Sequence, residues 1–110
     1  MYFKGRSGRI YNFLVYPRGT SFKKGLGAAY CVTNRYLKKD RSYVHGAIHV
    51  GQTADLSAEF DDHPKQSCFG KYGGNCVCIR EEPDGDTRAQ VVQDLIDNYD
   101  PPCNKGKEHE

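Results

Sequence analysis

In the segment AIHVGQTADLSAEFDDH (47–63), the residue pattern changes halfway along from one typical of a strand to one typical of a helix. This change decides the fold. Residues 47–53 are rich in β-branched residues and predict a strand. After the turn-prone Gly51, Leu56 and Phe60 stand four residues apart, the spacing of one helix face. The segment therefore predicts a strand that turns into a helix, with His49 on the strand and acidic residues on the helix.

Three further strands and a second helix are predicted around this unit. The strand segments are YNFLVYP (11–17), GAAYCVTN (27–34) and NCVCIRE (75–81). Pro17 makes the first of them an edge strand. The basic segment 35–46 is predicted to be a long hairpin loop.

Residues 87–99 repeat apolar side chains at helical spacing and predict the second helix. Thr87 and Gln90 fit a capping box at its start, and two prolines follow its end. The predicted order of elements is βββαβα, without an internal repeat.

Size and composition indicate one domain. The chain has 110 residues, of which 1–104 are predicted to form the domain and 105–110 a charged tail. No run of 18 apolar residues occurs, and the first ten residues lack the apolar stretch of a secretory signal, so we expect no membrane partner. Five cysteines are an odd number without a regular framework, which favours reduced thiols and a cytoplasmic protein.

Charge is distributed unevenly along the chain. Residues 1–41 contain ten Lys and Arg against one acidic residue, and residues 42–110 contain six against thirteen. This asymmetry predicts a basic surface for phosphates or for an acidic partner, provided that folding does not interleave the two parts. The alternative is a mixed surface that serves only solubility.

Four blocks of the sequence resemble, in order, the blocks of the GIY-YIG nuclease superfamily. They are AAYCVTN (28–34), HVGQTADLSAEFDDH (49–63), NCVCIRE (75–81) and DLIDNYDPPCN (94–104). The resemblance covers residues 27–104 and implies an α+β fold in which helices flank a small antiparallel sheet. The segment before residue 27 then adds an N-terminal strand.

The resemblance also implies a set of site positions, which this chain fills in part. The family's chemistry needs a metal-bound carboxylate, a tyrosine that delivers the nucleophile and an arginine that stabilises charge. Tyr30 matches the first tyrosine, and His49 stands where the second tyrosine is expected. Glu59 replaces the arginine and Val92 replaces the metal-binding glutamate. Tyr30 and His49 are the candidate catalytic residues, and a divalent metal such as Mg²⁺ is the cofactor only if the site is active.

These replacements predict a degenerate site. The predicted helix over 55–62 carries four acids, at 55, 59, 61 and 62, and no basic residue, so it would repel a phosphodiester. Val92 has the spacing of a core residue. Tyr30 and His49 are equally well explained as packed residues, His63 as favourable to the helix dipole at its C-terminal end, and Asn104 as ordering the chain after the prolines.

The cysteines could either bind zinc or be buried as free thiols. The candidate ligands are Cys68, Cys76, Cys78, Cys103 and His63. Zinc prefers thiolate and imidazole ligands, but the Cys-x-x-Cys spacing of structural sites is missing. The sequence favours small buried thiols and no metal site.

Three functions follow as alternatives. The first is a catalytically impaired GIY-YIG-like domain that binds nucleic acid through Arg35, Lys38, Lys39 and Arg41, with two tyrosines interleaved. The second is an active endonuclease that uses Tyr30 and His49 with a carboxylate such as Glu81 or Glu82. The third is a protein-interaction module whose acidic helix faces a basic partner.

Overall fold

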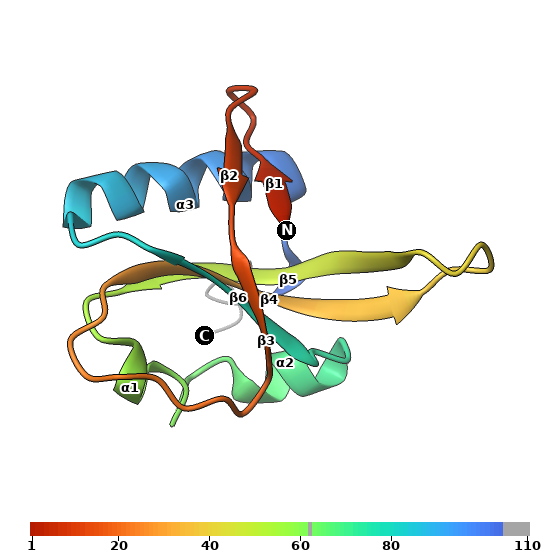
Figure 1. Ribbon diagram of the computed structural model, residues 1–110, viewed down its shortest axis with the longest axis horizontal. Coiled ribbons are helices and arrows are strands. Elements are labelled where there is room, and N and C mark those ends of the chain that lie inside the picture. Colours follow the sequence, from red (N-terminus) through yellow and green to blue (C-terminus); the bar gives the residue numbers. More distant parts are fainter. Residues whose placement is uncertain (62, 105–110) are drawn as a thin grey trace.

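An antiparallel sheet forms the centre of the computed structural model, which describes residues 1–61 and 63–104 (Figure 1). Its strands are β3 (Leu14–Pro17), β4 (Ala28–Leu37), β5 (Tyr43–Thr53) and β6 (Cys76–Glu81). They lie in the order β3-β6-β4-β5, so β3 is an edge strand as predicted. The expected α+β class with an antiparallel sheet is confirmed.

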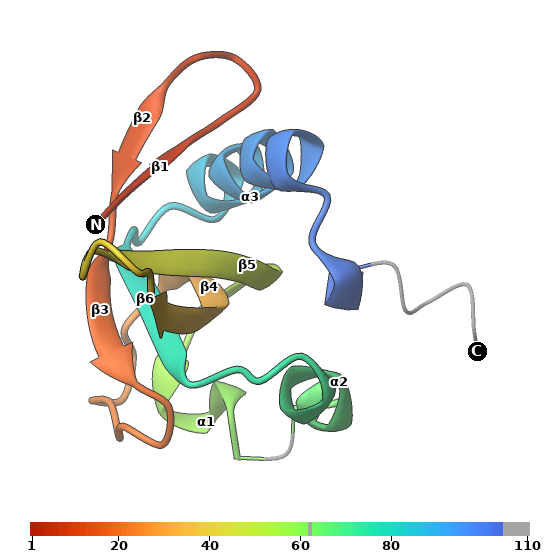
Figure 2. The same cartoon turned by 90° about the vertical axis from the view of Figure 1, so that its right-hand side faces the viewer.

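Helices cover both faces of this sheet. Helix α3 (Gly85–Tyr99) lies on one face, and the short helices α1 (Leu56–Glu59) and α2 (Gln66–Lys71) lie on the other (Figure 2). The sequence did not predict α2. Helix α3 begins two residues earlier than predicted because the carboxylate of Asp84, not Thr87, caps it by accepting the Thr87 N–H at 2.9 Å.

The N-terminal segment forms a second, two-stranded sheet. Strands β1 (Tyr2–Lys4) and β2 (Ile10–Asn12) are antiparallel and stand beside α3 (Figure 1). The predicted strand 11–17 is therefore divided at Phe13, whose buried ring packs edge-on against Phe3 at a centroid distance of 5.2 Å.

Alternating side chains of the sheet build one apolar cluster on each face. On β4, Ala29 and Cys31 belong to the cluster under α3, whereas Ala28, Tyr30 and Val32 belong to the cluster that α1 and α2 cover. This alternation matters for function because it fixes which residues can meet at one site.

Segment 35–46 is a correction to the sequence prediction. It is the paired outer part of β4 and β5, with register pairs from Arg35↔His45 to Leu37↔Tyr43, and only 38–42 form the turn. Both faces of this part lie outside the core, so its side chains are largely polar. The sequence therefore did not indicate a strand here. The hairpin extends beyond the rest of the sheet (Figure 1).

The prediction of reduced thiols is wrong for two of the five cysteines. Cys68 on α2 and Cys103 form a disulfide across 35 residues of sequence, with their Cα atoms 5.9 Å apart. The pairing could not be predicted because only the folded chain brings α2 next to the segment after α3. The expectation of a cytoplasmic protein rested on reduced thiols. Because two of the cysteines form a disulfide, the cysteines no longer support that expectation.

Folding interleaves the basic and acidic parts of the chain. Strands of the basic part pair with β6, and the β1–β2 hairpin lies against Asp94 of α3, which accepts hydrogen bonds from Ser7 and Tyr11. Basic and acidic segments of the chain therefore lie next to each other in the fold. In the described residues, no helix has the length and apolar character needed to cross a membrane.

Candidate functional site

Tyr30 lies in the middle of the sheet and turns its side chain toward α1. It pairs with Gly51 on β5 and Ile79 on β6, and it is only 2% exposed. Phe60 packs edge-on against its ring at a centroid distance of 4.9 Å. A Cβ atom on Gly51 would lie 2.6 Å from the Tyr30 hydroxyl oxygen, so this position must be glycine for the hydroxyl to fit.

Regular pairing with Val32, two residues after Tyr30 on β4, places His49 on the same face of the sheet as Tyr30. Val32 pairs with His49 and Thr33 pairs with Ala47, which leaves one extra residue on β5 at this point. The His49 ring lies 6.0 Å from the Tyr30 ring and 5.2 Å from the His63 ring, measured between centroids. His49 is buried, and its Nδ1 atom has no hydrogen-bond partner among the described residues.

Tyr30, Glu59 and His63 form a hydrogen-bonded group that we call the Tyr30 network. The Tyr30 hydroxyl donates to Glu59 Oε2 at 2.6 Å and lies 2.9 Å from His63 Nε2. The backbone N–H of Lys65 donates to His63 Nδ1 at 3.0 Å. A neutral His63 therefore carries its proton on Nε2 and donates it to the Tyr30 oxygen.

Burial controls the protonation of this group. It raises the pKa of Tyr30 far above its ordinary value, and the hydrogen bond and charge of Glu59 raise it further. Burial lowers the pKa of His49 to about 4, and the neighbouring His63 lowers it as well, although the nearby Cys103 carbonyl acts in the opposite direction. Burial also lowers the pKa of His63, against the influence of Glu59. At neutral pH Tyr30 is therefore a phenol, and both His63 and the neighbouring His49 are neutral imidazoles.

The arrangement is poorly suited to phosphodiester cleavage. The Tyr30 hydroxyl donates its hydrogen bond to Glu59, and its raised pKa opposes formation of a phenolate that could activate a water. The Glu59 carboxylate would repel an approaching phosphate. In the described chain, the hydrogen-bond and ion-pair partners of the network include no lysine or arginine side chain.

The structure brings together three of the four positions that were selected by the resemblance to GIY-YIG nucleases. Tyr30, His49 and Glu59 share one face of the sheet. Val92 does not join them, because it lies on α3 and packs against the apolar cluster of the opposite face. Asn104 holds the edge of β5, where its side chain exchanges two hydrogen bonds of 2.8 Å with the backbone of Val50, as its ordering role predicted.

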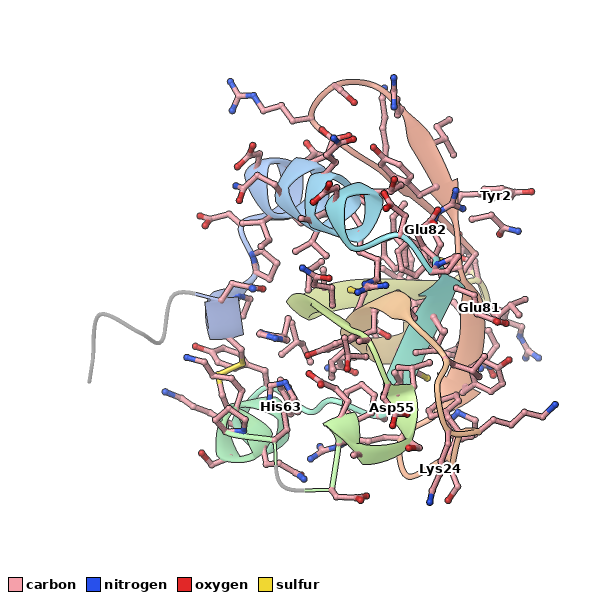
Figure 3. The ribbon with its side chains drawn as sticks, turned by 90° about the vertical axis from the view of Figure 1, so that its left-hand side faces the viewer. Tyr2, Lys24, Asp55, His63, Glu81 and Glu82 are labelled. Atoms are coloured by element: carbon pink, nitrogen blue, oxygen red, sulfur yellow. A yellow bond between two sulfur atoms is a disulfide. The ribbon has the colours of Figure 1, made fainter. Side chains whose placement is uncertain are left out.

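His63 is the site residue that sequence reasoning assigned incorrectly. The helix ends at Glu59, so His63 does not lie at a helix C-terminus but on the segment toward α2 (Figure 3). Pro64 disfavours helical backbone at the residue before it, which helps to end the helix early. The four-residue spacing of Glu59 and His63, whose side chains lie 3.6 Å apart, was the available signal.

Because the helix is shorter than predicted, the acids that the structure describes here do not lie together on one helix face. Asp55 is the N-cap of α1, and its carboxylate accepts hydrogen bonds from Ser57 and from the backbone N–H of Gly25. Asp61 follows the helix, and residue 62 lies outside the described residues. Glu81 and Glu82 lie well apart from His63 (Figure 3).

A cavity of about 450 Å³, which we call the aromatic pocket, lies next to the Tyr30 network. Phe60 is common to both, since it lines the pocket and contacts Tyr30. The other apolar lining residues are Val32, Phe69 and Val77, and Arg18 and Gln66 supply polar groups. Sequence analysis did not identify this pocket.

The basic hairpin, residues 35–45, is the second candidate region. The Arg35 guanidinium lies over the Tyr43 ring, 4.0 Å from its centroid. Tyr36 and Tyr43 are half or more exposed, and Lys38, Lys39 and Arg41 are exposed at and beside the turn. The single acid, Asp40, accepts hydrogen bonds from the backbone and hydroxyl of Ser42.

In the described part of the chain, no three His, Cys, Asp or Glu side chains are placed to hold a metal ion. The candidate zinc ligands are separated, because Cys68 and Cys103 are bonded to each other while Cys76 and Cys78 are buried on β6. In comparisons with known proteins, no family model, curated protein or solved structure matches the chain.

Proposed function

We propose that this chain is a GIY-YIG-like domain that binds nucleic acid through the basic hairpin and does not cleave it. The observation that carries the proposal is the placement of four cations, Arg35, Lys38, Lys39 and Arg41, on a hairpin that projects from the sheet (Figure 1). Elsewhere in the sheet, folding mixes basic and acidic segments, whereas this hairpin carries one acid. Such a projection can follow a phosphate backbone without bringing the acids of α3 near it.

Exposed aromatic rings favour nucleic acid over an acidic protein as the partner. Tyr36 and Tyr43 expose their rings beside the cations, and Arg35 is already stacked on Tyr43. Bases stack on such rings in a sequence-tolerant way, worth about 1–3 kcal/mol per base. The Tyr30 network supports the absence of cleavage, because Glu59 occupies the hydroxyl that the family's chemistry would use.

Salt-dependent binding tests the proposal. If all four cations contact phosphates, the slope of log K against log salt should be about −3.6 for a duplex and about −2.8 for a single strand. Fluorescence anisotropy with labelled oligonucleotides between about 20 and 200 mM salt measures this slope. Reversing Lys38, Lys39 and Arg41 to glutamate should abolish binding at all of these salt concentrations.

A control with the same change in net charge separates the hairpin from general attraction. Arg9, Lys23 and Lys24 are exposed and lie outside the hairpin. Their reversal to glutamate should retain most of the affinity. Equal losses in both triple variants, or no binding by the unaltered protein at low salt, would refute binding through the hairpin.

A further inference from the structure

The aromatic pocket has the composition of a site for a flat ring. Val32 and Val77 contribute from the sheet, and Phe60 and Phe69 contribute from the helical side. Its volume of about 450 Å³ lies within the range of small-molecule sites, about 300–1,000 Å³. Such walls favour an apolar or aromatic group over a hydrated ion.

Arg18 gives the pocket one positive charge. Its guanidinium lies 5.6 Å from the centroid of the Phe69 ring and donates to the Gly74 carbonyl at 3.0 Å and to Gln66 Oε1 at 3.2 Å. These bonds hold the side chain in place and, within the described chain, use two of its five N–H donors. The remaining donors can bind an anionic group of a ligand.

Asn75 connects this arginine to the basic hairpin. Its backbone carbonyl accepts the N–H of Arg18 at 2.9 Å. Its side chain accepts the backbone N–H of Arg35 at 2.8 Å and donates to the Arg35 carbonyl at 3.0 Å. Asn75 therefore holds the backbone at both Arg18 and Arg35, so Arg18 and the base of the hairpin lie at the same end of the sheet.

We propose that the aromatic pocket takes up one unstacked base of a single strand held by the basic hairpin, with the phosphate of that nucleotide at Arg18. This inference rests on the proposed function and adds single-stranded nucleic acid as its substrate class. A nucleotide has the two features that the pocket matches, a flat ring and an anion. A base paired in a duplex would first have to leave its stack, so the pocket favours single strands.

Filling the pocket tests the proposal. Thr20 lines the pocket and Ser21, the next residue of the same loop, is exposed and does not. Thr20→Phe should weaken single-strand binding about tenfold, which is within the range for the loss of one stacked base, and leave duplex binding unchanged. Ser21→Phe is the matched control and should bind both ligands normally. Arg18→Gln, which removes the charge without adding volume, should weaken single-strand binding even if Thr20→Phe folds poorly.

Photochemical crosslinking locates the base. A single-stranded oligonucleotide that contains 5-iodouracil should crosslink to Phe60 or Phe69, and Thr20→Phe should remove this product. Crosslinks confined to Tyr36 and Tyr43, with normal single-strand affinity in Thr20→Phe, would overturn the pocket inference and leave binding by the hairpin intact. Absence of oligonucleotide binding by the unaltered protein would overturn both, and binding of uridine monophosphate alone would then identify a site for free nucleotides.

Discussion

Acid should destabilise this protein through His49, which is buried as a neutral imidazole. Burial lowers its folded-state pKa to about 4, and the unfolded value is about 6.5. Between these values the unfolded chain binds a proton that the folded chain does not, so this contribution to stability is complete above pH 6.5 and is lost as the pH falls toward 4. At about 1.4 kcal/mol for each pKa unit, the loss at pH 4 amounts to about 3 kcal/mol.

Replacing His49 with phenylalanine should remove this dependence. The side chain has aromatic neighbours, Tyr30 and Phe69, and its Nδ1 atom has no partner in the described chain, so the change at pH 7 should stay within about 1 kcal/mol. Urea denaturation of the oxidised protein, followed by circular dichroism at pH 7, 5.5 and 4, measures the difference. Because the carboxylates are the same in both proteins, a variant that loses as much stability as the unaltered protein would show that the reasoning about His49 is wrong.

Three further outcomes are expected. The unaltered protein should not cleave plasmid or single-stranded DNA with Mg²⁺ or Mn²⁺, and Glu59→Arg combined with Val92→Glu should stay inactive in the same assay because the two positions lie on opposite faces of the sheet. Changing Cys68 and Cys103 to serine should lower the free energy of unfolding by about 4 kcal/mol, from the entropy of a 35-residue loop, measured by urea denaturation. Asn104→Ala should lower it by about 1–3 kcal/mol and speed amide hydrogen exchange at the β5 edge.

The sequence predicted the elements that lie in the core. Strands β4 and β6 each have a continuous buried stretch, which appears in the sequence as the apolar runs 28–32 and 76–79. The outer hairpin 35–45 was missed because both of its faces meet solvent, so no apolar alternation marks it. Helix α2 was missed because only Phe69 of its six residues is buried.

The site was harder to predict than the core, because its contacts join segments that only the turns of the folded chain bring together. The resemblance selected Tyr30 and His49, but it gave Glu59 only as a replacement for an arginine and as one of four acids on a helix. Glu59 turns inward because the buried Tyr30 hydroxyl needs an acceptor. His63 and the Cys68–Cys103 disulfide depend on how the chain continues after α1 and α3, and local spacing does not determine those paths.

The structural role of residue 59 conflicts with the catalytic role that the resemblance to GIY-YIG nucleases implies. The resemblance implies an arginine there, but a cation would leave the Tyr30 hydroxyl without the acceptor that Glu59 supplies at 2.6 Å. It would also place positive charge beside His63, whose imidazole burial keeps neutral. The carboxylate therefore stabilises the face of the sheet that adjoins the aromatic pocket, and the same carboxylate keeps phosphate away from Tyr30. The proposed binding of nucleic acid therefore uses the surfaces of Arg18 and Arg35, whose backbones Asn75 holds.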